Sequence, residues 1–155
     1  MKILKTGLLG LLFTLCAACA FAQRIGPAKT ETSFNKPELF RDLPNRMDVS
    51  QQSLAPLLQN NVGEKVSIPL ASGFTFDGVV VSKSNAAERR YKTVVIKSTN
   101  RPGASFTITG LQKADGTMQY SGRMLSLKHS DAYEMKEDGG RLALEKTPLD
   151  DLVSE

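Results

Sequence analysis

Cysteine, histidine and tryptophan are scarce in this chain, which has two cysteines, one histidine and no tryptophan among 155 residues. Zinc sites are built mainly from cysteine and histidine, so the chain offers too few ligands for zinc chemistry. A hydrolase triad needs a nucleophile, a histidine and an acid that converge in space. The single histidine lies in the run His129-Ser130-Asp131, but neighbouring residues of a strand point to opposite faces. We therefore expect no catalytic residue and no enzymatic activity.

Motifs that hold cofactors and metal ions are also missing. The chain contains neither G-x-G-x-x-G nor the P-loop pattern, so no nucleotide cofactor is expected. One group of acidic residues near a turn could supply oxygen ligands to calcium: Asp131, Glu134, Glu137 and Asp138. Their spacing matches no calcium-binding loop, so we expect these carboxylates to be solvated and predict no metal site.

The first 22 residues have the pattern of a secretory signal peptide. A basic start precedes an apolar run over residues 7–21, and Ala20-Phe21-Ala22 fits an A-x-A cleavage pattern. The apolar run is shorter than the roughly 20 residues that a membrane span requires. We predict cleavage between Ala22 and Gln23, which gives a secreted or periplasmic mature chain without a membrane span.

Both cysteines, Cys16 and Cys19, lie within the predicted signal peptide. The mature chain would therefore form no disulfide, although its compartment permits one. Cys16-Ala17-Ala18-Cys19 also resembles the segment at which bacterial lipoproteins are cleaved before a lipid-modified cysteine. An outer-membrane lipoprotein anchored through Cys19 is the alternative localisation, but the usual large aliphatic residue three positions before that cysteine is absent.

Cleavage would leave 133 of the 155 residues, a length that suits one domain. It would also lower the formal net charge from +4 to +2, because it removes Lys2 and Lys5. Nucleic-acid binding depends on dense basic patches, so no nucleic-acid partner is expected. Residues 23–36 are polar and are predicted to form a flexible leader, and residues 37–155 a single β-rich domain. The sequence leaves the oligomeric state open.

Short helices are expected at both ends of this domain. Ser53 can cap a helix that includes Leu54, Leu57 and Leu58, because Pro56 is tolerated in a first turn. At the C-terminus, Thr147-Pro148 followed by two acidic residues favours a second helix. We expect that helix to cover an open end of a sheet.

Between these helices the alternation of apolar and polar residues predicts seven strands, which cover residues 66–70, 74–81, 91–97, 104–112, 117–127, 132–136 and 141–146. The dipeptide Asp115-Gly116 and the run Asp138-Gly139-Gly140 are typical of tight turns between strands. No helical segment separates the strands. We therefore predict an all-β antiparallel meander that forms a curved sheet, a small sandwich or a barrel.

The order of these features resembles the non-catalytic β modules that accompany secreted bacterial metalloproteases and related surface proteins. In those modules, a short helix with paired leucines precedes a strand, a glycine turn and a strand of F-x-x-V type. The matching stretches here are Leu54 to Leu58, Val66 to Leu70, Gly73, Phe76 to Val79, and later Tyr120 to Met124 and Asp131 to Met135. The protease motif H-E-x-x-H is absent, so the resemblance implies an accessory module and no catalytic residue.

The residues that we expect to contact a partner are Arg89, Arg90 and Tyr91, in the most basic stretch of the chain. Arginine and tyrosine are enriched at interface hot spots, although a basic run of this length is also common on solvated surfaces. We thus expect a non-enzymatic domain that binds another macromolecule, such as an extracellular protease or an envelope protein. The alternative is a small-molecule carrier, in which a β-barrel would enclose an apolar cavity of at least about 300 Å³.

Overall fold

The computed structural model describes residues 35–70, 73–84 and 90–153, all within one compact unit, Thr32–Glu155. The predicted signal peptide and nearly all of the leader lie outside the described residues. The described residues form eight strands and three short helices. These are β1 (Arg46–Val49), α1 (Gln51–Leu54), η2 (Leu57–Gln59), β2 (Lys65–Pro69), β3 (Thr75–Lys83), β4 (Tyr91–Ser98), β5 (Ser105–Gln112), β6 (Met118–Leu125), β7 (Asp131–Asp138), β8 (Arg141–Pro148) and α2 (Leu149–Val153).

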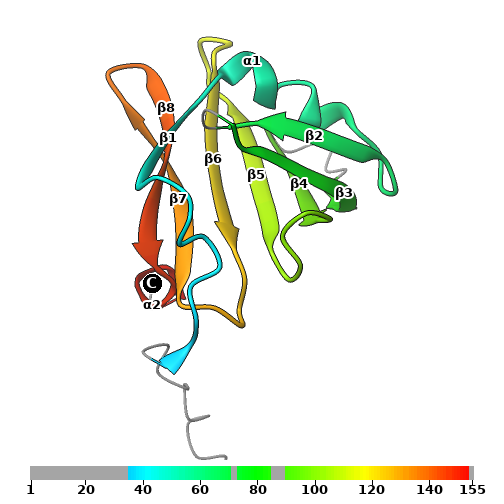
Figure 1. Ribbon diagram of the computed structural model, residues 1–155. Coiled ribbons are helices and arrows are strands. Elements are labelled where there is room, and N and C mark those ends of the chain that lie inside the picture. The colour runs from blue at the N-terminus through cyan, green and yellow to red at the C-terminus, as the bar shows by residue number, and fades with distance from the viewer. Residues whose placement is uncertain (1–34, 71–72, 85–89, 154–155) are drawn as a thin grey trace, which may run out of the picture. The chain divides into compact units, whose positions relative to one another are not determined.

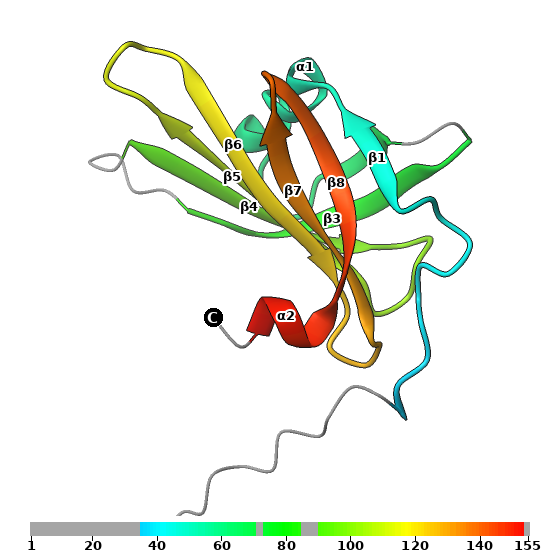
Figure 2. The same cartoon turned by 90° about the vertical axis from the view of Figure 1, so that its left-hand side faces the viewer.

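The eight strands form one antiparallel sheet in the order β1-β8-β7-β6-β5-β4-β3-β2. From β2 to β8 each strand pairs with the next one along the chain, which confirms the predicted all-β meander. The sheet curls into a half-barrel and does not close, so β1 and β2 remain its two edges (Figures 1 and 2).

The seven predicted strands correspond to β2 through β8, and β1 is an eighth strand that the sequence pattern did not predict. It is only four residues long and alternates exposed Arg46 and Asp48 with buried Met47 and Val49. It pairs with the last strand of the meander, where Met47 lies opposite Leu144. So short an alternation is weak evidence for a strand until its distant pairing partner is known.

The turn between β5 and β6 has the predicted geometry. Gly116 has a φ of +85°, a value that favours glycine. The N–H of Lys113 donates to the carbonyl of Thr117 at 2.8 Å. The Asp115 carboxylate accepts the backbone N–H of Thr117 at 2.9 Å and its hydroxyl at 2.6 Å. These two hydrogen bonds lower the pKa of Asp115.

The helical segment after β1 begins three residues earlier than predicted. Ser50, not Ser53, caps α1, and its hydroxyl accepts the N–H of Gln52 at 3.2 Å. Pro56 then starts the separate one-turn helix η2. Both serines have the chemistry of a cap, so local sequence alone did not distinguish them. The three leucines of the segment are buried as expected: Leu54, Leu57 and Leu58.

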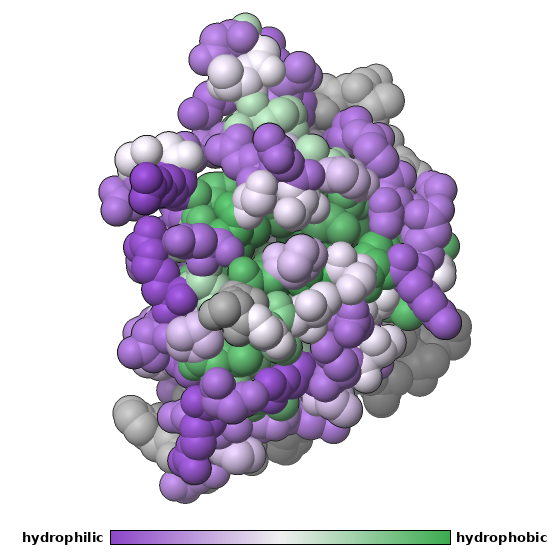
Figure 3. All heavy atoms as spheres, turned by 45° about the horizontal axis from the view of Figure 1, so that its top comes forward, coloured by the Kyte–Doolittle hydropathy of each residue, from purple (hydrophilic) through white to green (hydrophobic). Residues whose placement is uncertain are grey.

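Side chains on the concave side of the sheet fill the half-barrel. Phe76 and Phe106 meet edge to face with ring centroids 5.7 Å apart. Gly110 leaves room for Leu58 of η2, because a Cβ on this glycine would clash with the Leu58 Cδ1. Figure 3, which views the top and open side of the half-barrel, shows apolar side chains surrounded by a hydrophilic rim. The largest fully buried side chains are Tyr133, Phe40, Phe76, Phe106, Met47, Leu54, Ile68, Ile96, Ile108, Met124, Leu144 and Val80.

Residues 36–45, which we call the strap, are held against the sheet by polar side chains. The Asp131 carboxylate accepts the backbone N–H groups of Leu39 and Phe40 at 2.6 and 2.8 Å. Lys146 Nζ donates to the carbonyl of Phe40 at 2.7 Å. The Tyr133 hydroxyl donates to the carbonyl of Pro44 at 2.5 Å. The charged residues Asp131 and Lys146 therefore satisfy strap backbone groups that would otherwise be unpaired.

Two ionisable groups near the strap have shifted pKa values. Burial, together with the negative charges of Asp131 and Asp42, raises the pKa of Tyr133 to about 12. The Arg101 guanidinium donates to the Asp42 carboxylate at 2.9 Å, and this hydrogen bond lowers the pKa of Asp42. Both shifts are consistent with a strap that the folded protein holds in place.

The C-terminal helix α2 is present as predicted, but it lies on the convex side of the sheet and does not cover an open end, as we had expected. Leu149 and Leu152 pack with Ala132 of β7 and with Leu125 of β6. Arg123 donates to the carbonyl of Leu152 at 3.1 Å. The helix therefore covers the outer side of the place where β6 and β7 meet.

The sheet is incompletely paired between β6 and β7. β6 pairs with β5 over eight residue pairs and β7 with β8 over eight, whereas β6 and β7 pair only from Arg123↔Glu134 to Leu125↔Ala132. Beyond these pairs the two strands diverge (Figure 2).

Candidate functional site

The convex side of the sheet carries a largely uncharged area over β3 to β6. Charged residues border it, because Lys65 and Lys97 lie opposite Val79 and Arg123 lies opposite Thr107. The residues of this area alternate along each strand with buried residues, so their side chains point away from the core. We call this area the outer patch. It consists of Val79, Val81, Tyr91, Thr93, Val95, Thr107, Thr109, Leu111, Gln119 and Ser121.

The centre of the outer patch is a ladder of three cross-strand pairs between β4 and β5: Tyr91↔Leu111, Thr93↔Thr109 and Val95↔Thr107. In the middle pair the two threonine Oγ1 atoms are 2.9 Å apart and hydrogen-bond to each other. The middle of the ladder therefore directs methyl groups and mutually satisfied hydroxyls outward, and has little need of water.

Two aliphatic side chains of the outer patch are notably exposed. Leu111 is 40% exposed and Val81 is 47% exposed. Val81 lies in a β-bulge, because the register with β4 shifts between Val80 and Ser82. A bulge re-aims side chains and commonly marks a functional part of a sheet.

The remainder of the convex side has a different character, because ion pairs cross it from β6 to β1. Arg123 pairs with Glu134 at 3.5 Å, Lys136 pairs with Glu145 at 3.6 Å, and Glu145 also accepts from Arg46 at 2.6 Å. These side chains are paired with one another and partly exposed. Ion pairs between exposed side chains contribute little to stability. They limit the uncharged area to one side of the sheet.

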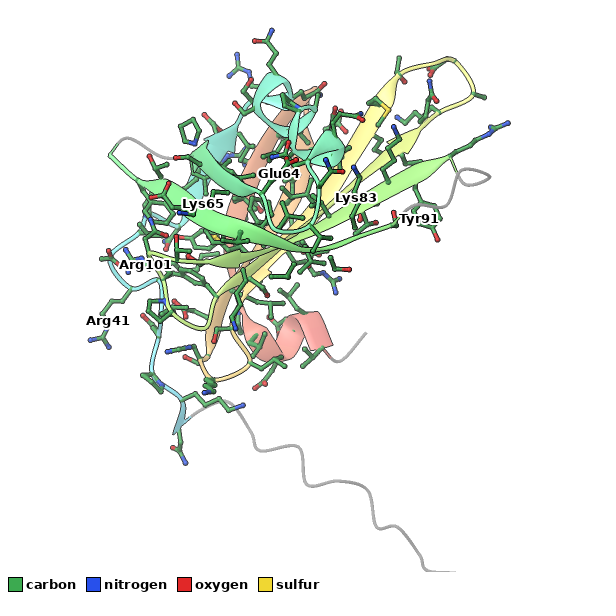
Figure 4. The ribbon with its side chains drawn as sticks, turned by 90° about the vertical axis from the view of Figure 1, so that its right-hand side faces the viewer. Arg41, Glu64, Lys65, Lys83, Tyr91 and Arg101 are labelled. Atoms are coloured by element: carbon green, nitrogen blue, oxygen red, sulfur yellow. The ribbon has the colours of Figure 1, made fainter. Side chains whose placement is uncertain are left out.

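Two of the three predicted contact residues, Arg90 and Tyr91, lie at the edge of the outer patch. Tyr91 is the first residue of β4, and Figure 4 shows it on the opposite side of the sheet from Glu64 and Lys83. Arg90 is exposed beside it, and its carbonyl accepts the N–H of Gln112 at 2.8 Å. Arg89 lies outside the described residues.

Of the ten members of the outer patch, only Tyr91 was among the contact residues predicted from the sequence. Alternation identifies the outward residues of each strand, but the rows that cross the strands depend on the register. The register becomes visible only when residues such as Thr93 and Thr109 are seen to pair.

His129 lies in the turn between β6 and β7 and does not meet an acid. The Nδ1 atom of its ring is 2.8 Å from the Ser126 hydroxyl, and its backbone N–H donates to the Ser126 carbonyl. The Asp131 carboxylate is directed at the strap amides instead. Among the described residues, the run from His129 to Asp131 therefore does not bring a histidine and a carboxylate together.

The acidic residues considered for calcium are also separated by their partners. Glu134 pairs with Arg123, and Asp131 binds the strap. Within residues 35–70, 73–84 and 90–153, no group of three or more histidine, cysteine or acidic residues is arranged to hold a metal ion. In the same residues, no helix has the length and apolar character needed to cross a membrane.

Two surface grooves are lined by residues that do not belong to the outer patch. One, of about 650 Å³, is lined mainly by polar residues of the strap, β8 and α2, including Glu38, Lys146 and Asp150. The other, of about 410 Å³, lies near Ser67 and Asp77. In the second groove the Ser67 hydroxyl donates to Asp77 at 2.6 Å. Their most prominent polar groups already have partners within the protein, so neither groove presents an evident ligand site.

Comparison of the chain with protein-family models, with curated proteins and with solved structures found no match. No function can be transferred from a relative, so the function is inferred from the surface of this chain. The cleavage residues Ala22 and Gln23 lie outside the described residues, and the resemblance to metalloprotease accessory modules stays a prediction.

Proposed function

We propose that this protein is a non-enzymatic, secreted or periplasmic domain that binds another macromolecule through the outer patch. The partner that we expect is a protein of the same compartment, such as an extracellular protease or an envelope protein. The observation that carries the proposal is the uncharged three-pair ladder on β4 and β5, beside which Val81 and Leu111 remain exposed. The cores of protein interfaces are depleted in charge and surrounded by a polar rim, and the outer patch has this composition.

Recognition without chemistry is supported by the partners of the residues that could take part in catalysis. His129 is hydrogen-bonded to a serine of its own turn. Asp131 is occupied by two strap amides. The carrier alternative receives no support of this kind, because aromatic and aliphatic side chains fill the concave side, where a ligand would have to lie.

A lysine at the centre of the outer patch tests the proposal. Tagged protein is used to capture partners from the secreted and envelope fractions of the producing cells, and the captured protein is then titrated. Thr109→Lys should weaken this binding at least tenfold, about 1.4 kcal/mol, because it places an unpaired charge in a desolvated contact. Thr99→Lys is the matched control, since Thr99 is exposed outside the patch. Equal capture by both variants would contradict the proposal.

The basic residues beside Tyr91 provide a second arm of the same experiment. The double variant Arg89→Ala, Arg90→Ala should fold normally and bind the captured partner more weakly, by about 1 to 3 kcal/mol, if these arginines are anchors. Unchanged binding would show that they are solvated residues at the rim. His129→Ala should leave binding unchanged, and loss of a measurable turnover in that variant would contradict the non-enzymatic assignment.

A further inference from the structure

The border of the outer patch carries two lysines that flank one of its residues. Lys65 of β2 and Lys97 of β4 lie directly opposite Val79 of β3, one on each side of it. Both side chains are exposed, and each is followed by a buried residue, so they point outward on the convex side together with Val79. The ion pairs between described residues include neither lysine. These two charges are therefore available to a partner.

The acidic residues of the same border are engaged within the protein. The Asp77 carboxylate accepts from the Ser67 hydroxyl at 2.6 Å and from the Asn100 amide at 3.2 Å. Glu134, beside the patch on β7, pairs with Arg123 at 3.5 Å. Such partners use the acceptor capacity of a carboxylate, whereas a lysine ammonium group without a partner keeps three donors for an incoming anion. The border therefore offers cations to a partner more readily than anions.

A third cation lies at the opposite end of β4. Arg90 is exposed and directly precedes Tyr91, the first residue of the strand. Lys97 is the outward residue six positions after Tyr91, which corresponds to about 20 Å of strand. In the turn that follows the neighbouring strand β5, Asp115 accepts two hydrogen bonds from Thr117. Cations thus border both ends of the uncharged ladder.

We propose that the partner contributes an acidic protein segment, whose uncharged centre covers the ladder and whose flanking carboxylates pair with the cations at its two ends. One carboxylate pairs with Lys65 and Lys97, and another pairs with Arg90. The inference rests on the proposed function, because it states the chemistry of the partner at the same surface. Opposite charges across an interface steer association and fix the register of the two partners, and like charges exclude wrong partners.

The uncharged ladder between the cations distinguishes this segment from other occupants. A DNA duplex carries a charge about every 1.7 Å of its axis, and an anionic membrane carries charged head groups over its whole surface. Either would place anions against Thr93 and Thr109, whose hydroxyls already bond each other. A second copy that used the same patch would bring the same cations to the interface. A protein segment with acidic flanks is therefore the occupant to which we commit.

The probe for this inference is a set of three displayed peptide libraries, selected in parallel on the intact exported protein. Each library has five random uncharged residues between two fixed residues, which are glutamate, glutamine or lysine. In an extended peptide the fixed residues lie about 20 Å apart, the separation of the two ends of the ladder. The glutamate library should yield at least about tenfold more binders than the glutamine library, and the lysine library the fewest. Equal yields, a higher yield from lysine, or no binder from any library would overturn the inference.

Charge reversal locates the carboxylates of the selected peptide. Lys65→Glu and Lys97→Glu, made separately, should each weaken binding of the best glutamate peptide at least about fivefold at low salt, mainly by slowing association. Near 1 M salt, where charges are screened within about 3 Å, the difference should be less than about twofold. Arg141→Glu is the matched control, because it makes the same charge change at an exposed residue of β8. Equal weakening by the control would reduce the effect to net charge and overturn the inference.

Two outcomes distinguish this inference from the proposed function. If Thr109→Lys weakens partner binding but the reversals at Lys65 and Lys97 leave peptide binding unchanged, the outer patch is the interface and the acidic flanks are wrong. If the reversals weaken peptide binding while Thr109→Lys leaves partner binding unchanged, the cations bind carboxylates and the centre of the patch is not the interface.

The remaining occupants have tests of their own. Vesicles of phosphatidylglycerol should not retain the protein more than vesicles of phosphatidylcholine. Retention that is lost in Lys97→Glu would assign the border to a lipid surface and overturn the inference. Self-association that Lys97→Glu abolishes, measured by analytical ultracentrifugation, would assign the border to a second copy and overturn it as well.

Discussion

Gly116 has a backbone conformation that a β-branched residue adopts only with strain. Its φ is +85°, and a Cβ at this position would meet no atom within 4 Å. The cost of Gly116→Val therefore comes from the backbone alone and should be about 1 to 3 kcal/mol. Chemical denaturation followed by circular dichroism measures the loss. An unchanged midpoint would contradict the turn between β5 and β6.

Tyr133 makes stability depend on alkaline pH. Its pKa is about 12 in the folded protein and about 10 in an unfolded chain. Between these values the unfolded state releases the phenolic proton and the folded state retains it, so the free energy of unfolding decreases as pH rises. The contribution is fully present below pH about 10 and is lost as pH approaches about 12.

Tyr133→Phe tests this dependence. The variant lacks the hydrogen bond to Pro44, so it should be about 1 kcal/mol less stable at neutral pH. Its stability should also decline less steeply between pH about 10 and about 12, because it has no phenol at this position. Denaturation of both proteins over this pH range measures the difference, in which the other titrating groups cancel. Parallel curves would show that Tyr133 does not cause the decline.

At the scale of elements, α2 forms a small cluster of its own. Leu149 and Leu152 pack with Ala132 and Leu125, separately from the main core. Leu152→Ala should lower the free energy of unfolding by about 2 kcal/mol, at the low end of the range for buried leucine. Amides of β3 to β5 that exchange only when the whole domain unfolds should exchange faster by no more than this loss of stability, and the other amides of these strands should be unchanged. Faster exchange of those other amides would show that α2 supports the entire sheet.

The sequence predicted the elements whose signals are local. Alternation and turns such as Asp115-Gly116 were sufficient for β2 to β8, because each strand pairs with its neighbour along the chain. β1 was missed because its four residues gain a clear role only by pairing with β8. The cap was misplaced because Ser50 and Ser53 have the same capping chemistry, so the local sequence does not distinguish them.

The candidate site was predicted only in part for a similar reason. Tyr91 was identified from its residue type and basic neighbours, whereas the uncharged ladder depends on register across β4 and β5. The lysines at its border depend on register in the same way, because Lys65 and Lys97 lie beside Val79 only once β2, β3 and β4 have paired.

At the scale of the whole molecule, the predicted export has a direct chemical test. The exported protein should begin at Gln23 and have the mass of residues 23–155, with or without cyclisation of the terminal glutamine. Since Cys16 and Cys19 would both be removed, a reducing agent should leave the melting temperature unchanged. Intact-mass spectrometry and a thermal melt measure these properties. A lipid-bearing species that begins at Cys19 would instead indicate membrane anchoring.

The pairing of β1 with β8 has a consequence for the order in which the molecule is completed. A chain made or translocated from its N-terminus presents Arg46–Val49 early, but their partner, Leu142–Glu145, comes almost a hundred residues later. Neighbouring hairpins can form as they emerge, whereas the first strand must wait for nearly the entire chain. Release of the C-terminal strand is therefore the event that lets the first strand enter the sheet, and a chain halted before β8 would leave β1 without its partner.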